Sequence, residues 1–176
     1  VVNADTGLLL PDFRAEERTF QLLTQVAGRA GRADLRGEVI FQTRNPDAKA
    51  IRYAVSYDYD GFAREELAER RPLHFPPFGH LASVEFRGPN EQRVERIAEN
   101  WTTILHTHST EELQIGDPVP ASIQRIKKQY RYRTVIKSRN AKHGQLQKAL
   151  RRTQKAYGNA PNGYYISIDV DAVSLL

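Results

Sequence analysis

The spacing of hydrophobic residues divides the first part of the chain into alternating helices and strands. Phe20, Leu23 and Ala27 recur at helical spacing, so one side of that segment faces a core. β-Branched and aromatic residues are concentrated at 38–43, which is typical of a strand. The elements expected in this first unit, residues 1–71, are a strand end at 1–4, a loop through Gly7 and Pro11, a helix from about residue 14, a strand at 38–43, and helices at 47–55 and 59–70.

A proline-rich segment at 72–80 separates the first unit from the rest of the chain. It contains three prolines and a glycine. Proline lacks the backbone N–H that helices and sheets use, and it restricts the residue before it. Because two phenylalanines flank the Pro76-Pro77 pair, we predict a packed joint rather than a flexible linker.

The second unit, residues 81–176, contains both hydrophobic periods. Residues 81–87 alternate as in a strand, and Asn90 can cap a helix whose apolar face runs to Leu105. The expected elements are strands at 81–87, 130–137 and 164–170, and helices after Asn90 and at 143–157. Residues 113–115 and 122–126 are short strand candidates on either side of a turn at Pro118 and Pro120. We summarise their order as β-α-β-β-α-β, a small α+β sheet with helices on one face. The chain as a whole is predicted to be of the α/β class.

Composition excludes several kinds of site and location. The 176 residues include no cysteine, which excludes disulfides and thiolate metal sites and favours the cytoplasm. No apolar run approaches the roughly 18 residues that a membrane-spanning helix needs. There is also no methionine, and the chain opens on residues typical of a buried strand. We therefore expect the sequence to be a piece of a longer protein.

Charge is strongly segregated along the chain. Between residues 118 and 168 there are 12 of the 26 basic residues and no acidic one, while the remaining chain has a net charge of −7. Such a segment produces a local positive field that attracts polyanions. Nucleic acid or an acidic protein tail is the expected partner, and a solvated basic surface without a partner is the alternative.

Within this basic segment, two patterns place cations together. In the strand at 130–137, Tyr130 and Tyr132 alternate with arginines, so bases stacked on the rings and phosphates on the arginines would suit single-stranded DNA. The alternative is that both tyrosines cover a core. On the helix at 143–157, basic residues share the face opposite Leu146 and Leu150. The predicted contacts to DNA or to an acidic tail are Arg131, Arg133, Lys137, Gln145, Lys148, Arg151, Arg152 and Lys155.

A second candidate site lies at residues 25–32, which read QVAGRAGR. Gln25, Arg29 and Arg32 are spaced i, i+4, i+7 and would share one helix face. Gly28 and Gly31 beside them permit close approach of a ligand or backbone. Two guanidiniums and an amide suit a triphosphate, where arginine stabilises charge that develops in phosphoryl transfer. The alternative is a helix that ends in glycine with solvated arginines.

This pattern resembles motif VI of superfamily 2 helicases. The surrounding stretches at 4–7, 11–18, 73–78 and 168–171 resemble one family in particular, the primosomal helicases of replication restart. The resemblance extends over almost the entire chain. It implies that the first unit ends the second RecA-like lobe of a helicase and that the second unit is a C-terminal domain similar to ribosomal protein S10.

The resemblance also implies an activity. The family couples ATP hydrolysis to 3′-to-5′ DNA unwinding, recognises stalled forks and initiates primosome assembly. Arg29 and Arg32, with Gln25, would act on ATP; Asp5 and Gly7, with Gly28 and Gly31, would belong to the nucleotide site. Expected partners are forked and single-stranded DNA, the tail of single-stranded DNA-binding protein, and primosome proteins, in the cytoplasm at the nucleoid.

Several family motifs are missing from this sequence. It contains neither the lysine loop nor the acidic motif that hold phosphates and Mg²⁺, nor the zinc-binding cysteines of the family. We therefore expect ATP, Mg²⁺ and zinc to be bound in the full-length protein, none by this piece alone, which should not hydrolyse ATP by itself. The alternatives are a binding module that acts alone and an RNA helicase of the same superfamily.

Overall fold

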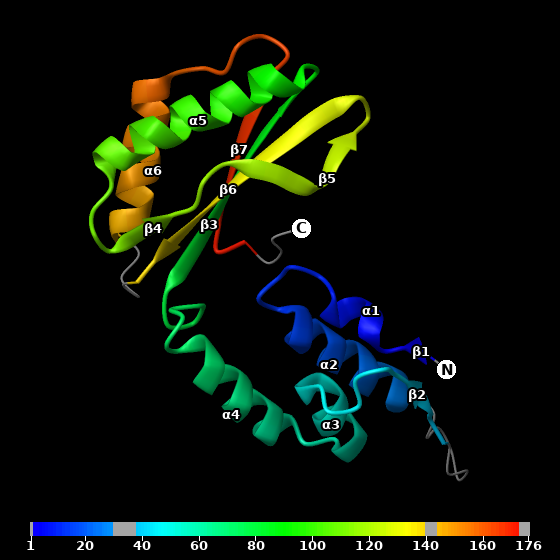
Figure 1. Ribbon diagram of the computed structural model, residues 1–176. Helices are drawn as coiled ribbons and strands as arrows, with labels where there is room; N and C mark the ends of the chain where they lie inside the picture. Colours follow the sequence, from blue (N-terminus) through cyan, green and yellow to red (C-terminus); the bar gives the residue numbers. More distant parts are fainter. Residues whose placement is uncertain (1, 30–37, 140–143, 173–176) are drawn as a thin grey trace. The chain divides into compact units, whose positions relative to one another are not determined.

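The computed structural model describes residues 2–29, 38–139 and 144–172 (Figure 1). The chain forms two compact units, Val1–Glu69 and Arg70–Leu176. The proline-rich segment predicted to be a joint therefore lies inside the second unit. Its Pro76-Pro77 peptide bond is cis.

The first unit is a small α/β assembly. Its elements are β1 (Val2–Asn3), α1 (Asp5–Leu8), α2 (Ala15–Ala27), β2 (Phe41–Gln42), α3 (Lys49–Ser56) and α4 (Tyr59–Arg70). The two strands pair in parallel. The expected helices are confirmed, whereas the strand predicted at 38–43 is only two residues long and α1 replaces a predicted loop. Two short parallel strands do not establish a RecA-like lobe, which stays a prediction.

The core of the first unit is built by the residues at helical spacing. Phe20 and Leu23 of α2 are buried against Ile51 of α3 and Phe62 of α4. The rings of Phe20 and Phe62 stack with centroids 4.4 Å apart. The start of α2 depends on Asp12, whose Oδ1 accepts a hydrogen bond from the Arg14 N–H at 2.9 Å.

The second unit is an antiparallel sheet with two helices packed on one face (Figure 1). Its elements are β3 (His80–Gly88), α5 (Glu91–His108), β4 (Leu113–Ile115), β5 (Val119–Ile126), β6 (Gln129–Ser138), α6 (Gly144–Tyr157) and β7 (Tyr165–Val170). The sheet order is β4-β6-β3-β7, and β5 also pairs with β6. The second unit is therefore a small mixed α/β domain with an antiparallel sheet, which confirms the predicted fold class. The S10-like assignment stays a prediction.

The observed order, β-α-β-β-β-α-β, contains one strand more than the summary order derived from the sequence. The region around Pro118 and Pro120 was expected to be a turn, but Pro120 lies within β5 and opposite Tyr132 of β6. This is possible because β5 is an edge strand, where the N–H that proline lacks would face away from the sheet.

The core of the second unit lies between the sheet and its helices. Trp101 of α5 is fully buried, and its ring meets Phe86 of β3 edge-on at 5.7 Å. Leu146 and Leu150 of α6 complete this cluster. The predicted cap is confirmed, because Asn90 Oδ1 accepts a hydrogen bond from the Arg93 N–H at 2.9 Å. The β-strand alternation and the apolar helix faces were therefore sufficient to predict this core.

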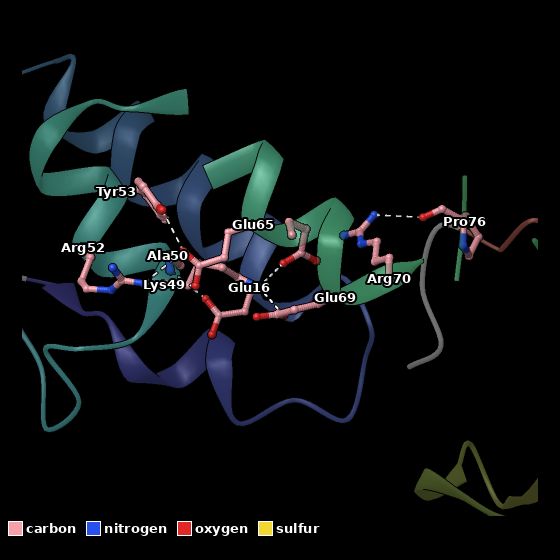
Figure 2. Close-up of polar contacts among 10 residues, drawn as sticks. Glu16, Lys49, Ala50, Arg52, Tyr53, Glu65, Glu69, Arg70 and Pro76 are labelled. Atoms are coloured by element: carbon pink, nitrogen blue, oxygen red, sulfur yellow. Dashed lines mark hydrogen bonds and ion pairs between the residues drawn. The ribbon is translucent and has the colours of Figure 1, made fainter. Parts of the chain in front are cut away.

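A buried charge cluster connects α3 to α4 in the first unit (Figure 2). The Lys49 ammonium is 2.5 Å from a Glu66 carboxylate oxygen and 2.6 Å from one of Glu69, and Lys49 is only 6% exposed. Burial disfavours the charged ammonium, but hydrogen bonds to both glutamates and their charges outweigh it, so the pKa of Lys49 is raised. The cluster thereby fixes the two helices by charge as well as by packing.

We predict that Lys49→Met destabilises the first unit by about 3–5 kcal/mol at neutral pH, because it removes the cation that neutralises buried Glu66. The measurement is urea unfolding, with amide exchange on α3 and α4 to locate the loss. Since the folded pKa of Lys49 is raised, its stabilisation is complete below the unfolded pKa near 10.5 and is lost as pH rises through the folded value.

The control is Arg52→Met. Arg52 pairs with Glu65 at 3.2 Å, but both side chains are well exposed. Such a surface pair contributes about 0–1 kcal/mol. Equal losses in the two variants would contradict the assignment of Lys49.

Candidate functional site

Asp5 is the first residue of α1 and lies two residues after the end of β1, at the carboxyl end of the parallel strand pair. In parallel sheets this end is where ligands bind. The Thr43 hydroxyl donates to Asp5 Oδ1 at 2.6 Å, and the Arg44 N–H donates to Oδ2 at 2.8 Å. The Thr43 bond first, and then the Arg44 bond, lower the pKa of Asp5. Asp5 is therefore held ionised and oriented by the segment after β2.

A hollow of about 450 Å³ opens beside Asp5. It is lined by Asn3, Asp5, Thr6, Leu9, Gln42, Thr43 and Arg44. Gly7 faces the opposite way, because a Cβ there would lie 2.4 Å from the Thr19 hydroxyl of α2. Of the predicted nucleotide residues, Asp5 thus lines a cavity, whereas Gly7 lets α1 pack closely on α2.

The predicted arginine face at 25–32 is only partly described. Helix α2 ends at Ala27, with Gly28 as its C-cap. Arg29 lies two residues beyond the last helical residue, so the predicted helix ends before Arg29, and the turn closes with the Arg29 N–H on the Val26 carbonyl. Both side chains are exposed. The predicted residues Gly31 and Arg32 lie outside the described residues.

The arginines of β6 lie on the sheet face opposite the helices. Arg131 donates from Nε to Glu85 Oε2 of β3 at 2.9 Å and forms a second, shorter contact to the same oxygen. An Arg133 nitrogen lies 3.7 Å from that oxygen, and Arg133 is 8% exposed. On the helix-covered face, Tyr132 is 6% exposed and part of the core. The predicted alternation is confirmed, with Tyr132 serving the core and both arginines engaged by Glu85.

Lys137 is also occupied within the second unit. Its ammonium donates to the Leu73 carbonyl at 3.1 Å and lies 4.0 Å from the centre of the Phe75 ring. Burial lowers the pKa of Lys137. This residue therefore fastens the proline-rich segment to β6, which explains why that segment is packed.

The cations of α6 remain at the surface. Leu146, Ala149, Leu150 and Thr153 are buried. The predicted contact residues on this helix are all exposed: Gln145, Lys148, Arg151, Arg152 and Lys155. Gln145 accepts a hydrogen bond from the Thr110 hydroxyl at 3.0 Å. We define the exposed cations of α6 as the α6 basic face.

One end of the α6 basic face borders a hollow of about 430 Å³. Arg152, Lys155 and Ala156 line it together with His108, the last residue of α5. His108 is not among the residues predicted to contact a partner. Its approach to Arg152 depends on the packing of α5 against α6, which no local pattern reveals.

A larger hollow, of about 650 Å³, was not anticipated from the sequence. Arg93 and Arg96 of α5 line it, with Tyr157 and Tyr164. The Arg93 guanidinium lies over the Tyr164 ring at 5.0 Å. The same helix directs acidic residues toward Tyr132, whose pKa is raised by burial and by the charges of Glu95, Glu91 and Glu99. Helix α5 thus separates its charges between two sides.

The described residues contain neither a cluster suited to a metal ion nor a helix suited to a membrane. Among residues 2–29, 38–139 and 144–172, no three His, Asp or Glu side chains are grouped as a metal site would require. Within the same ranges, no helix combines the length and apolar character needed to cross a membrane.

A family model and several known proteins match this chain, and they agree on its family. Residues 71–173 match the model of the primosomal protein N C-terminal domain. The chain is similar to replication restart protein PriA of Synechocystis, with 35% identity over 99% of this chain, of Bacillus subtilis, with 37% over 97%, and of Treponema pallidum, with 39% over 98%. It spans only 20%, 21% and 26% of the lengths of these relatives.

We predict that Thr43→Val raises the pKa of Asp5 toward its ordinary value of 3.8, because it removes the strongest hydrogen bond to the carboxylate. A carbon-detected NMR titration measures this directly. Since the folded pKa is depressed, the stabilisation is present above the unfolded value and lost as pH falls through the folded one. Thr24→Val is the matched control, because the Thr24 hydroxyl bonds only the Phe20 and Gln21 carbonyls. An Asp5 pKa that is identical in both variants would refute the assignment.

Proposed function

Because the chain belongs to the primosomal protein N C-terminal domain family, we propose that it is the C-terminal part of an ATP-dependent DNA helicase that restarts replication at stalled forks. The observation that carries the proposal is the similarity to replication restart protein PriA along nearly the whole chain, at 35% identity over 175 residues in one relative. Unwinding with 3′-to-5′ polarity, fork recognition and a location at the nucleoid belong to the same proposal.

In this proposal the first unit contributes to the ATP site without forming it. Asp5 and Thr6 line a hollow at the carboxyl end of β1, and exposed Arg29 lies just past the end of α2. The fit to a nucleotide is partial, because the sequence contains no glycine-rich loop with a lysine to hold the phosphates. ATP supplies the reacting phosphoryl group and Mg²⁺ neutralises it. Arg29 and Arg32 would stabilise the developing charge, and zinc would be bound elsewhere in the full-length protein.

The second unit is proposed to dock on DNA through the α6 basic face. Lysines and arginines on one exposed helix face neutralise phosphates, so binding should weaken steeply as salt rises. The segment 118–168, which includes α6, contains no acidic residue. Arg131, Arg133 and Lys137 would support the docking surface rather than contact DNA, because each already has a partner within the unit.

A second partner, an acidic protein tail such as that of single-stranded DNA-binding protein, is supported by the hollow beside the same face. Arg152, Lys155 and His108 border this shallow hollow together, so the carboxylates of a short acidic peptide could bind all three. Primosome proteins are further proposed partners.

Replacing Arg32 by alanine in the full-length protein should reduce ATP turnover by about 10³-fold or more while DNA affinity is retained, since an arginine that stabilises transferring phosphate contributes 10³–10⁵. Arg29→Ala should act in the same direction. ATP hydrolysis stimulated by forked DNA and binding of the same DNA are measured side by side. Arg64→Ala, an exposed residue of α4, is the control. Undiminished turnover in the Arg32 variant would rule out this role.

The double variant Lys148→Glu/Arg152→Glu should weaken binding of the chain to forked DNA by at least about tenfold and reduce the salt slope, because two phosphate contacts are replaced by repulsion. Fluorescence anisotropy at two salt concentrations is the measurement, with an acidic peptide titrated in parallel. Arg64→Glu, a charge reversal at an exposed residue of α4, is the control. If both variants bind DNA as the wild type does, the α6 basic face is not the docking surface.

A further inference from the structure

Strands β5 and β6 form a hairpin whose tip carries two adjacent lysines. Ile126 pairs with Gln129, so Lys127 and Lys128 alone make the loop. Residues 122–128 are all exposed. Figure 1 shows this hairpin, in yellow, reaching away from α5 and α6. The tip is therefore a projecting cationic feature, separate from the α6 basic face.

Both loop residues have a backbone conformation that lysine rarely adopts. The φ angles of Lys127 and Lys128 are 49° and 65°. A two-residue hairpin loop with positive φ at both positions is the type I′ turn, which strongly favours Asn-Gly because other side chains are strained there. With lysine at both positions, the tip carries two positive charges in place of the less strained Asn-Gly turn. Strain of this kind is concentrated at functional sites.

The base of the hairpin is fixed rather than loose. Between the pairs Pro120–Tyr132 and Arg125–Tyr130, four residues of β5 lie opposite Arg131 alone, which is a wide irregularity in the ladder. The Arg131 guanidinium donates to the Ile123 carbonyl within this bulge at 3.3 Å and to Glu85 of β3. Arg131 thus holds the projecting strand against the centre of the sheet, so the tip is presented in one orientation.

Apolar side chains accompany the charge on the hairpin. Ile123 is 61% exposed and Ile126 is 42% exposed. Arg125 adds a third cation, and its guanidinium lies 4.8 Å from the centre of the Tyr130 ring. The segment 118–168 contains no carboxylate that could neutralise these cations from within the hairpin. The combination is a narrow ribbon with a cationic tip and apolar flanks.

The available faces favour double-stranded over single-stranded DNA. Stacking of unpaired bases needs open aromatic faces. Tyr130 packs on Arg125, Tyr132 is in the core, and Tyr165, although 50% exposed, already has Arg87 over its ring. The major groove of a duplex, by contrast, has the width of a two-stranded β-ribbon and offers phosphates at its rims and thymine methyl groups on its floor.

We propose that the β5–β6 hairpin enters the major groove of duplex DNA, with Lys127 and Lys128 on phosphates and Ile123 or Ile126 on the base edges. This inference rests on the proposed DNA docking of the second unit. It adds a second contact surface, the β5–β6 hairpin, and specifies that this surface binds duplex DNA. The α6 basic face and the hairpin would then hold two parts of a forked DNA.

The test replaces Lys127-Lys128 by Asn-Gly in the chain. Because Asn-Gly is the preferred type I′ turn, K127N/K128G should raise the thermal midpoint of unfolding. The same change should weaken binding of a duplex by about tenfold or more and lower the slope of log K against log salt by about 2, since two phosphate contacts are lost. Greater stability with weaker binding separates function from folding.

Two further variants make the outcome decisive. I123S/I126S should weaken duplex binding and leave the salt slope unchanged, and R64N should change neither. If the wild type binds DNA and K127N/K128G binds the duplex equally well, the hairpin inference is overturned while the α6 docking proposal survives. If the wild type binds no DNA at all, both are overturned. If the turn variant loses only an acidic peptide and no duplex affinity, the ligand is a protein and the duplex assignment is wrong.

Discussion

The carboxylate of Glu85 lies among three arginines on the sheet face that the helices leave open. Arg131 and Arg133 reach it from β6, and Arg87 lies 3.4 Å from its second oxygen. An arginine that is 8% exposed, as Arg133 is, requires such a neighbour, because an isolated buried charge is strongly disfavoured. Through Arg131, the same carboxylate reaches the bulge of β5. One acidic residue thereby stabilises the centre of the sheet and the base of the hairpin.

This arrangement decides which positive charges are available to a partner. Arg131 and Arg133 share the single carboxylate of Glu85, and Lys137 is packed on Phe75, so we propose that they support the docking surface rather than form it. The exposed cations of α6 and of the hairpin tip remain outside this network. The number of basic residues in the sequence therefore overstates how many cations a partner can reach. We propose that a polyanion meets those of α6 and of the hairpin tip.

The sequence predicted the local elements more reliably than the sites. Alternation in β6 and the apolar faces of α5 and α6 predicted the second core, because burial imposes periods of 2 and 3.6 on the residues themselves. The partners of Arg131 and Arg133 could not be predicted, since Glu85 is 46 residues away from Arg131 and meets it only through strand pairing. The hollow at His108 and Arg152 likewise requires two packed helices. At Arg29, spacing alone predicted a helix that in the structure ends two residues earlier.

The central claim is that the second unit contacts forked DNA through α6 and the β5–β6 hairpin. Amide hydrogen exchange of the chain, measured with and without forked DNA, tests it residue by residue. The account predicts added protection at residues 122–129 and along α6, with none in α4. Protection confined to the first unit, or none in either unit at saturating DNA, would contradict it.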